Sequence, residues 1–169
     1  LETKSVLATS ILGGSFTVVS SFIGLWLGSI VDHHKKKTAM LVSSITTLIM
    51  FSAALAFLVS QPAEAFESVA HPQVWLIGAM LLIGIVAGNI RMIALPTLVT
   101  LLIPADERDK ANGMSGMVMG VSSSGAGILS GLALGFSSMF WVLASAIVLT
   151  VIAIIYLLLI DIPEKDIVH

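Results

Sequence analysis

The chain has 169 residues, of which 57% are hydrophobic and 11% are charged, and its mean hydropathy is +1.05. Because soluble domains carry roughly 25% charged residues, this composition predicts a membrane protein with the lipid bilayer as its main partner. The chain has no cysteine, which excludes disulfides, thiolate metal sites and cysteine nucleophiles. No residue pattern predicts a metal site, a cofactor or nucleic-acid binding.

Five apolar segments are long enough to cross a bilayer core, which takes about 20 residues of helix. A backbone exposed to lipid must satisfy its own hydrogen bonds, so we expect an all-α integral membrane bundle over residues 1–160. Residues 161–169 form a polar tail, which we expect to be cytoplasmic and to begin a central loop. The predicted spans cover residues 5–31, 38–60, 74–103, 111–134 and 138–160.

The basic residues gather at one end of this predicted bundle. The first linker, the third linker and the tail together carry six Lys or Arg, whereas the opposite end has Lys4 alone. The positive-inside rule therefore predicts a multi-pass protein of the cell membrane, with its N-terminus outside and its C-terminus cytoplasmic. The sequence starts at Leu1 with neither a methionine nor a signal-peptide n-region. We therefore expect a first helix to be missing from this end of a longer protein.

The first linker, GSIVDHHKKK, runs from Gly28 to Lys37. Lysines at a cytoplasmic helix end need no role beyond orientation, but Asp32 calls for another explanation. Its carboxylate can pair with the lysines or cap the N-terminus of a neighbouring helix, where the helix dipole favours negative charge. Gly28, four residues earlier, leaves room for a neighbouring backbone.

This linker resembles the loop between the second and third helices of major facilitator superfamily transporters. The matching positions are Gly28, Asp32, Lys36 and Lys37. His33 stands where that family usually has arginine, and Lys35 replaces its second glycine. In the family this motif latches the two halves of the transporter when the cytoplasmic side is closed. The resemblance therefore implies a gating role for Asp32.

The third linker, within LIPADERDKANGMSG, is similar to the loop between helices four and five of efflux members of the same superfamily. The family pattern P-x-x-x-R-x-x-A-N-G is matched at Pro104, Arg108, Ala111, Asn112 and Gly113. The alternative is a charged turn before a helix, because Asp106 and Glu107 near a helix N-terminus are favourable by themselves. Two matching loops at the expected separation are more specific than either one.

The fourth span is rich in glycine. Its small-xxx-small pairs favour close helix packing, and they are Gly116 with Gly120 and Gly127 with Gly131. Antiporters of the superfamily carry a Gly-Pro-x-x-Gly-Gly element in helix five, which is associated with a bend. The equivalent residues here are Ala126, Gly127, Ser130 and Gly131. The proline is absent, so the resemblance implies a bend without its proline-specific kink.

Arg91 is the one charged residue well inside a predicted span, where insertion scales give a cost of about 2.5–3.5 kcal/mol. We interpret it, together with Asn89, as part of a substrate or proton pathway. Its carboxylate partner would then lie on the missing helix or on the substrate. The alternatives are a structural pair, or a side chain that reaches toward the interface. Pro96 frees a backbone carbonyl, which helps to build a polar site or only shapes the helix.

Taken together, the chain resembles spans two to six of a major facilitator transporter of the drug- or macrolide-efflux branch. The resemblance implies a secondary active transporter, here a fragment, that exports small molecules or drugs in exchange for protons by alternating access. The missing partners would be the first helix and the C-terminal half. The rival interpretation is a five-helix membrane subunit or assembly factor without transport activity. No catalytic set can be assembled, so an enzyme is not expected.

Overall fold

The computed structural model describes residues 6–66, 68, 70–136 and 138–162, and every regular element in this part of the chain is helical. Helices lie in all five predicted ranges, and their ends differ from the predicted ones by three residues or fewer. A short 3-10 helix between α2 and α3 was not predicted. The elements are α1 (Val6–His33), α2 (Lys36–Ser60), η1 (Ala63–Phe66), α3 (Pro72–Leu102), α4 (Arg108–Phe136) and α5 (Met139–Leu159).

Three of these helices, α2, α3 and α5, are long and apolar enough to cross a membrane, and α1 makes a fourth if its two segments count as one span. The prediction of five spans is therefore supported for three helices, or up to four. The exception is α4, which has 29 residues but contains many glycines and serines, which lower its hydropathy. Of the predicted tail, residues 163–169 lie outside the described part of the chain.

The first helix bends by 44° between its segments Gly13–Gly24 and Trp26–His33. Two hydroxyl groups in the first segment bind the carbonyl four residues earlier: Thr17 donates to Gly13 at 3.1 Å and Ser21 donates to Thr17 at 2.8 Å. Such bonds tend to bend helices, and Gly24 at the junction adds flexibility.

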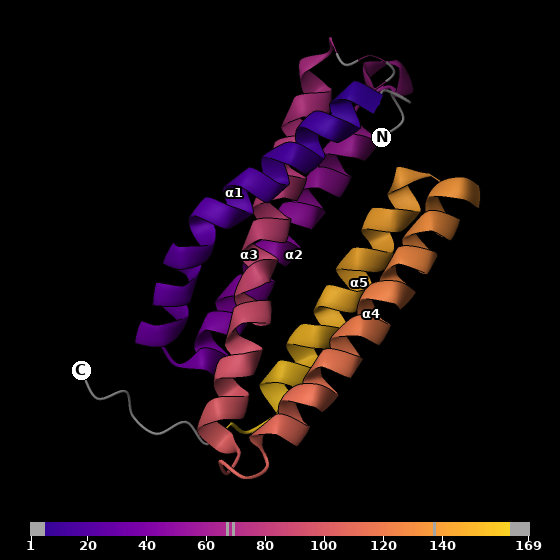
Figure 1. The fold of residues 1–169 in the computed structure, drawn as a ribbon. Helices are drawn as coiled ribbons and strands as arrows, with labels where there is room; N and C mark the ends of the chain where they lie inside the picture. The colour runs from indigo at the N-terminus through magenta and orange to yellow at the C-terminus, as the bar shows by residue number, and fades with distance from the viewer. Residues whose placement is uncertain (1–5, 67, 69, 137, 163–169) are drawn as a thin grey trace.

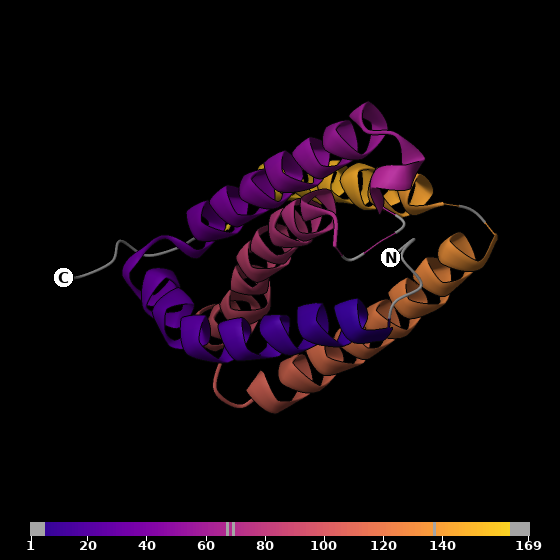
Figure 2. The same cartoon turned by 90° about the horizontal axis from the view of Figure 1, so that it is seen from above.

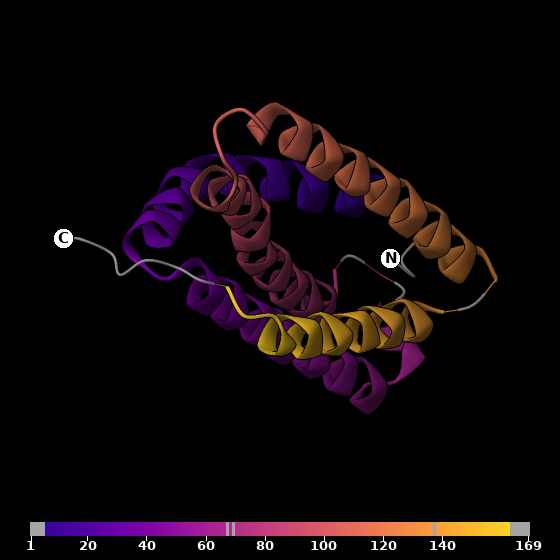
Figure 3. The same ribbon diagram turned by 90° about the horizontal axis from the view of Figure 1, so that it is seen from below.

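The helices are arranged around α3, which contacts α1, α2 and α4, while α5 packs on α2 (Figure 1). Viewed along the bundle, α3 lies between α1 and α2 (Figure 2). Successive helices run in opposite directions. The C-terminal ends of α1, α3 and α5 consequently meet at one end of the bundle, together with the two basic linkers (Figure 3).

Apolar packing is divided between the two ends of the bundle. One cluster joins α1, α2 and α3 near the basic linkers, and consists of Leu27, Val31, Ala39, Val86, Ile90 and Ala94. The other joins α2, η1, α3 and α5 at the opposite end, and consists of Ala54, Ala65, Phe66, Val74, Ile77 and Leu143. Between these clusters, the interface of α2 and α3 is built from small and polar residues.

In α2 the distribution of polar and apolar side chains is the reverse of that in a helix of a water-soluble protein. Its buried face carries Ser43, Ser44 and Thr47, whereas Val42 and Ile49 on other faces are more than half exposed. A helix in water buries its apolar stripe and exposes its polar face. Hydroxyl groups inside and aliphatic groups outside are the arrangement expected when the surrounding solvent is lipid.

Candidate functional site

The interface between α2 and α3 is held by hydrogen bonds from hydroxyl side chains. Ser43 Oγ donates to the Ala87 carbonyl at 2.6 Å. Thr47 Oγ1 donates to the Gly84 carbonyl at 2.9 Å and shares this proton with the Ser43 carbonyl of its own helix at 3.0 Å. Both acceptors on α3 are carbonyls of an intact helix, which small residues leave accessible. In a bilayer, such bonds between helices contribute on average about 0.6 kcal/mol each.

Gly84 sets how closely the two helices approach. A Cβ atom at this position would lie 2.8 Å from Cε1 of Phe51 and 3.2 Å from Cβ of Met50. Gly88, one turn further along α3, faces Thr47 Oγ1 and the guanidinium of Arg91. Gly84 and Gly88 therefore form a packed small-xxx-small pair.

The residues Ser43 and Thr47 on α2 and Gly84 and Gly88 on α3 form a seam between the two helices. Arg91 extends this seam toward the basic end of the bundle. Its Nη1 donates to Ser44 Oγ at 3.2 Å, and a Cβ on Gly88 would lie 3.2 Å from its Nη2. The side chain is half-buried and turns into the interface of α2 and α3, which argues against the alternative that it reaches along α3 to the membrane surface. Helices α2, α3 and α5 contain no Asp or Glu. Arg91 is thus a cation held by a neutral hydroxyl.

The two residues predicted alongside Arg91 lie on other faces of α3. Asn89 Nδ2 donates to Ser20 Oγ on α1 at 3.4 Å, so it links α1 to α3 rather than joining the Arg91 cluster. Pro96 is exposed, and α3 continues beyond it to Leu102. The Pro96 carbonyl accepts a hydrogen bond from Thr100 Oγ1 at 3.1 Å.

In the first linker, Lys36 contacts the backbone instead of the Asp32 carboxylate. Its buried Nζ donates to the carbonyls of Asp32 at 3.2 Å and His34 at 3.4 Å, where α1 ends. The Asp32 side chain is exposed. At Gly28 a Cβ atom would meet nothing within 4 Å, so no described backbone packs closely there.

The other predicted basic residues also bind helix ends. Lys37 Nζ donates to the carbonyls of Ile160 and Leu158 at the end of α5, and Arg108 Nε donates to the Ile103 carbonyl at the end of α3, at 3.0 Å. Together with Lys36, which begins α2 and binds the end of α1, these residues place a cation at each of the three helix C-termini gathered at this end. Such cations satisfy terminal carbonyls and offset the negative end of the helix dipole.

The four glycines predicted to pack α4 lie against open space among the described residues. A Cβ atom at any of them would meet nothing within 4 Å, and they are Gly116, Gly120, Gly127 and Gly131. No described side chain of α4 is buried. The packing role of these glycines therefore remains a prediction that requires a partner outside the described helices.

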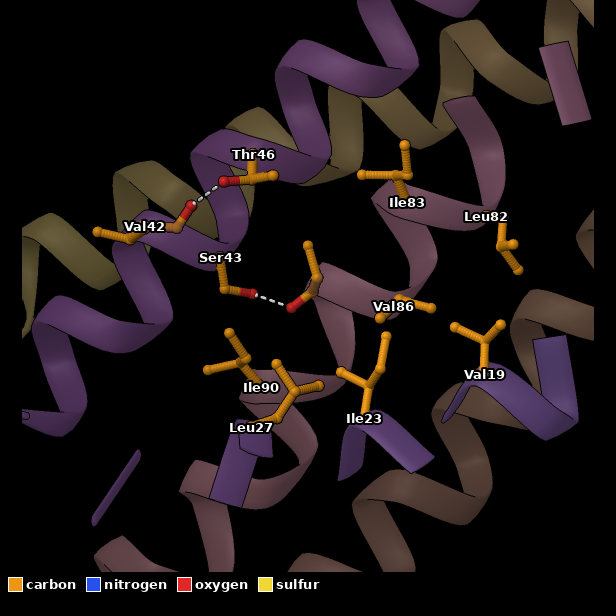
Figure 4. Close-up of a pocket in the computed structure, with 11 residues that line it drawn as sticks. Val19, Ile23, Leu27, Val42, Ser43, Thr46, Leu82, Ile83, Val86 and Ile90 are labelled. Atoms are coloured by element: carbon orange, nitrogen blue, oxygen red, sulfur yellow. Dashed lines mark hydrogen bonds between the residues drawn. The ribbon is translucent and has the colours of Figure 1, made fainter. Parts of the chain in front are cut away.

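An apolar pocket of about 370 Å³ opens between α1, α2 and α3 (Figure 4). Its lining residues are Val19, Ile23, Leu27, Val42, Ser43, Thr46, Leu82, Ile83, Val86, Ala87 and Ile90. It lies on the α1 side of the seam formed by α2 and α3. Within the described ranges, no group of three or more His, Asp or Glu could hold a metal ion.

The hydroxyl groups of Ser43 and Thr47, which join α2 to α3, were not predicted from the sequence. Ser43 and Thr47 lie four residues apart, as do Gly84 and Gly88 on the facing helix. Small residues at this spacing in two consecutive apolar segments were the available signal.

Comparison with known proteins gives a family for the chain. The model of the Major Facilitator Superfamily matches residues 2–168, which is nearly the whole sequence. No curated protein and no solved structure matches significantly. The match supports the resemblance drawn from the two linkers at the level of the superfamily.

Proposed function

The chain belongs to the Major Facilitator Superfamily, whose members are transporters and not enzymes, and from that premise we propose that it forms part of a proton-coupled exporter of small molecules or drugs. The observation that best supports this proposal is the cation at each of the three helix C-termini that meet at one end of the bundle. These three cations connect the first and third linkers to the ends of α1, α3 and α5. A bundle whose ends are joined in this way can rock as one body, which alternating access requires.

Asp32 supports a gate at this end. Lys36 and Lys37 of its own linker bind helix ends, and the Asp32 side chain is exposed. We place this end in the cytoplasm because of its basic residues. When the cytoplasmic side is closed, Asp32 then engages a partner in the other half of the transporter and stabilises the outward-open state.

Arg91 supports a polar pathway through the bundle. Guanidinium has five N–H donors, and among the described residues its hydrogen-bond partner is the Ser44 hydroxyl. A cation at this depth is costly unless it has a function or a carboxylate partner. We propose that Arg91 binds an anionic group of the substrate or a carboxylate that carries the coupling proton. The rival interpretation, a subunit without transport activity, has no comparable support in the family match.

The test is an efflux assay on the complete reading frame that contains this chain, in cells that lack other exporters. Asp32→Asn is expected to cut efflux while the amount of protein in the membrane stays unchanged. Asp161→Asn is the matched control, because it removes an exposed carboxylate at the same end of the bundle, just after α5. Wild-type efflux by Asp32→Asn, or equal losses in both variants, would exclude the gate. Absence of efflux for every compound tested with the wild-type protein would count against export itself.

A further inference from the structure

The buried hydroxyl group of Ser44 takes part in two hydrogen bonds of different kinds. Its proton is donated to the Met40 carbonyl of its own helix at 2.8 Å, and its oxygen accepts a proton from Arg91 Nη1 at 3.2 Å. A hydroxyl group has one proton to give. Because that proton is already bound within α2, Ser44 presents only lone pairs to α3. It can therefore bind a donor such as guanidinium, but it cannot donate to an anion.

Gly88 leaves the space into which the guanidinium turns. A Cβ atom at this position would lie 3.2 Å from Arg91 Nη2, which is closer than most contacts of a Cβ atom. Nη1 is thus held from α2 by Ser44, while Nη2 lies against Gly88 on α3. Both contacts act on the end of a long side chain, which loses much rotamer entropy when it is ordered.

The acceptor that holds Arg91 is neutral, and this has an electrostatic consequence. A carboxylate in its place would compensate the positive charge and occupy one edge of the guanidinium. A hydroxyl group fixes the guanidinium but leaves its charge uncompensated, since α2, α3 and α5 contain no Asp or Glu. Of the five N–H donors of guanidinium, described residues bind one, through Ser44.

We propose that Ser44 is a positioning residue, which holds the Arg91 guanidinium in place without neutralising it and so leaves the positive charge for an anion. The role of Ser44 in transport rests on the function proposed above for Arg91, which is to bind an anionic group of the substrate or a proton-carrying carboxylate. Ser44→Ala should therefore release Arg91. Ser44→Asp should hold Arg91 more firmly and at the same time neutralise it.

The first measurement follows Arg91 itself, in the full chain reconstituted in vesicles. Phenylglyoxal modifies arginine side chains, and this sequence has two, Arg91 and Arg108. Mass spectrometry gives the rate of modification of Arg91 relative to that of Arg108, which begins α4 and serves as the internal reference. We expect this ratio to rise several-fold above the wild-type value in Ser44→Ala and to fall several-fold below it in Ser44→Asp.

Thr150→Val is the matched control. Thr150 is a buried residue of α5 whose hydroxyl group donates to the Ala146 carbonyl, four residues earlier, at 2.7 Å, just as Ser44 donates to Met40. The substitution removes a bond of the same kind, but Arg91 keeps its bond to Ser44. The modification ratio should then stay at the wild-type value. An unchanged ratio in Ser44→Ala, or an equal rise in Thr150→Val, would overturn the proposal. If Ser44→Asp fails to fold, Ser44→Ala and this control decide the question.

Transport by the complete protein gives the second measurement. Ser44→Ala and Ser44→Asp should both disturb it at equal amounts of protein in the membrane, because the first displaces the charge and the second cancels it. A several-fold rise in KM with little change in the maximal rate identifies the substrate as the anion, whereas a shifted pH profile identifies a proton-carrying carboxylate. Thr150→Val should change neither.

The effect of Arg91→Ala separates this proposal from the proposed function. If Arg91→Ala changes transport while both Ser44 variants keep the wild-type KM and pH profile, Ser44 has no positioning role. If Arg91→Ala leaves transport unchanged, the pathway proposed for Arg91 fails, and the modification ratio still decides whether Ser44 positions the guanidinium.

Discussion

Gly84 is where an added side chain should disturb the bundle most. A Cβ atom there would lie 2.8 Å from Cε1 of Phe51 and 3.2 Å from Cβ of Met50. The ring of Phe51 can rotate away, but the Met50 Cβ is fixed by the backbone of α2. A larger side chain at Gly84 must therefore push α2 and α3 apart, which stretches the hydrogen bond from Thr47 to the Gly84 carbonyl.

The size of this effect follows from two contributions. Overpacking a filled interface costs about 1–3 kcal/mol, and loss of a hydrogen bond between helices costs about 0.6 kcal/mol on average, and up to about 1.7. Leucine gains up to about 1 kcal/mol of helix propensity over glycine, so Gly84→Leu should lower the free energy of unfolding by a net of about 1–3 kcal/mol. Gly116→Leu in α4 is the control, since its Cβ meets nothing within 4 Å and leucine gains up to about 1 kcal/mol of helix propensity over glycine.

The assay heats both purified variants in detergent and measures the remaining monodisperse fraction by size-exclusion chromatography. Gly84→Leu should lose this fraction at a clearly lower temperature than the wild-type protein, and Gly116→Leu at the same or a higher temperature. Equal midpoints for the two variants, or a lower midpoint for Gly116→Leu than for Gly84→Leu, would refute the packing argument.

The other predictions concern single polar contacts. Thr47→Val keeps the shape of the side chain but removes its hydroxyl, so the free energy of unfolding should fall by about 0.6–1.7 kcal/mol; an unchanged thermal midpoint would contradict the bond to Gly84. Lys37→Met and Arg108→Met each remove a cation from one helix C-terminus, worth about 0.3–1 kcal/mol. Hydrogen exchange should therefore rise in the last turn of α5 for the first variant and of α3 for the second, and a rise in both helices for either variant would contradict the separate caps. Arg91→Ala should change the substrate range or the proton coupling of the complete transporter, whereas unchanged efflux of every substrate would leave Arg91 a structural role.

The helices were predictable because a membrane span needs a long apolar segment, and hydropathy measures that length directly. The ends of the helices were predicted less accurately. The structure starts α2 at Lys36 and α4 at Arg108, whereas the predicted spans begin at residues 38 and 111. Hydropathy assigns such charged residues to linkers, although the backbone there is already helical. The 3-10 helix at Ala63–Phe66 lies in a segment that hydropathy describes only as polar.

The contacts of the candidate site were harder to predict from the sequence, because they depend on which helix ends lie side by side. Lys37 reaches the end of α5, more than 120 residues away along the chain. The sequence suggested only that the lysines belong to the cytoplasmic side. Ser44 gave no signal as the partner of Arg91, because a serine inside an apolar segment has little effect on hydropathy.

Everted membrane vesicles that contain the complete protein can reveal export driven by a proton gradient, because an exporter then moves its substrate into the vesicle. A respiratory substrate acidifies the vesicle interior, and the fluorescence of a candidate drug reports its uptake. We expect uptake that begins with acidification, stops when an ionophore collapses the pH gradient, and is reduced by Asp32→Asn. Uptake that persists without the gradient, or its absence for a broad panel of compounds under a full gradient, would contradict proton-driven export.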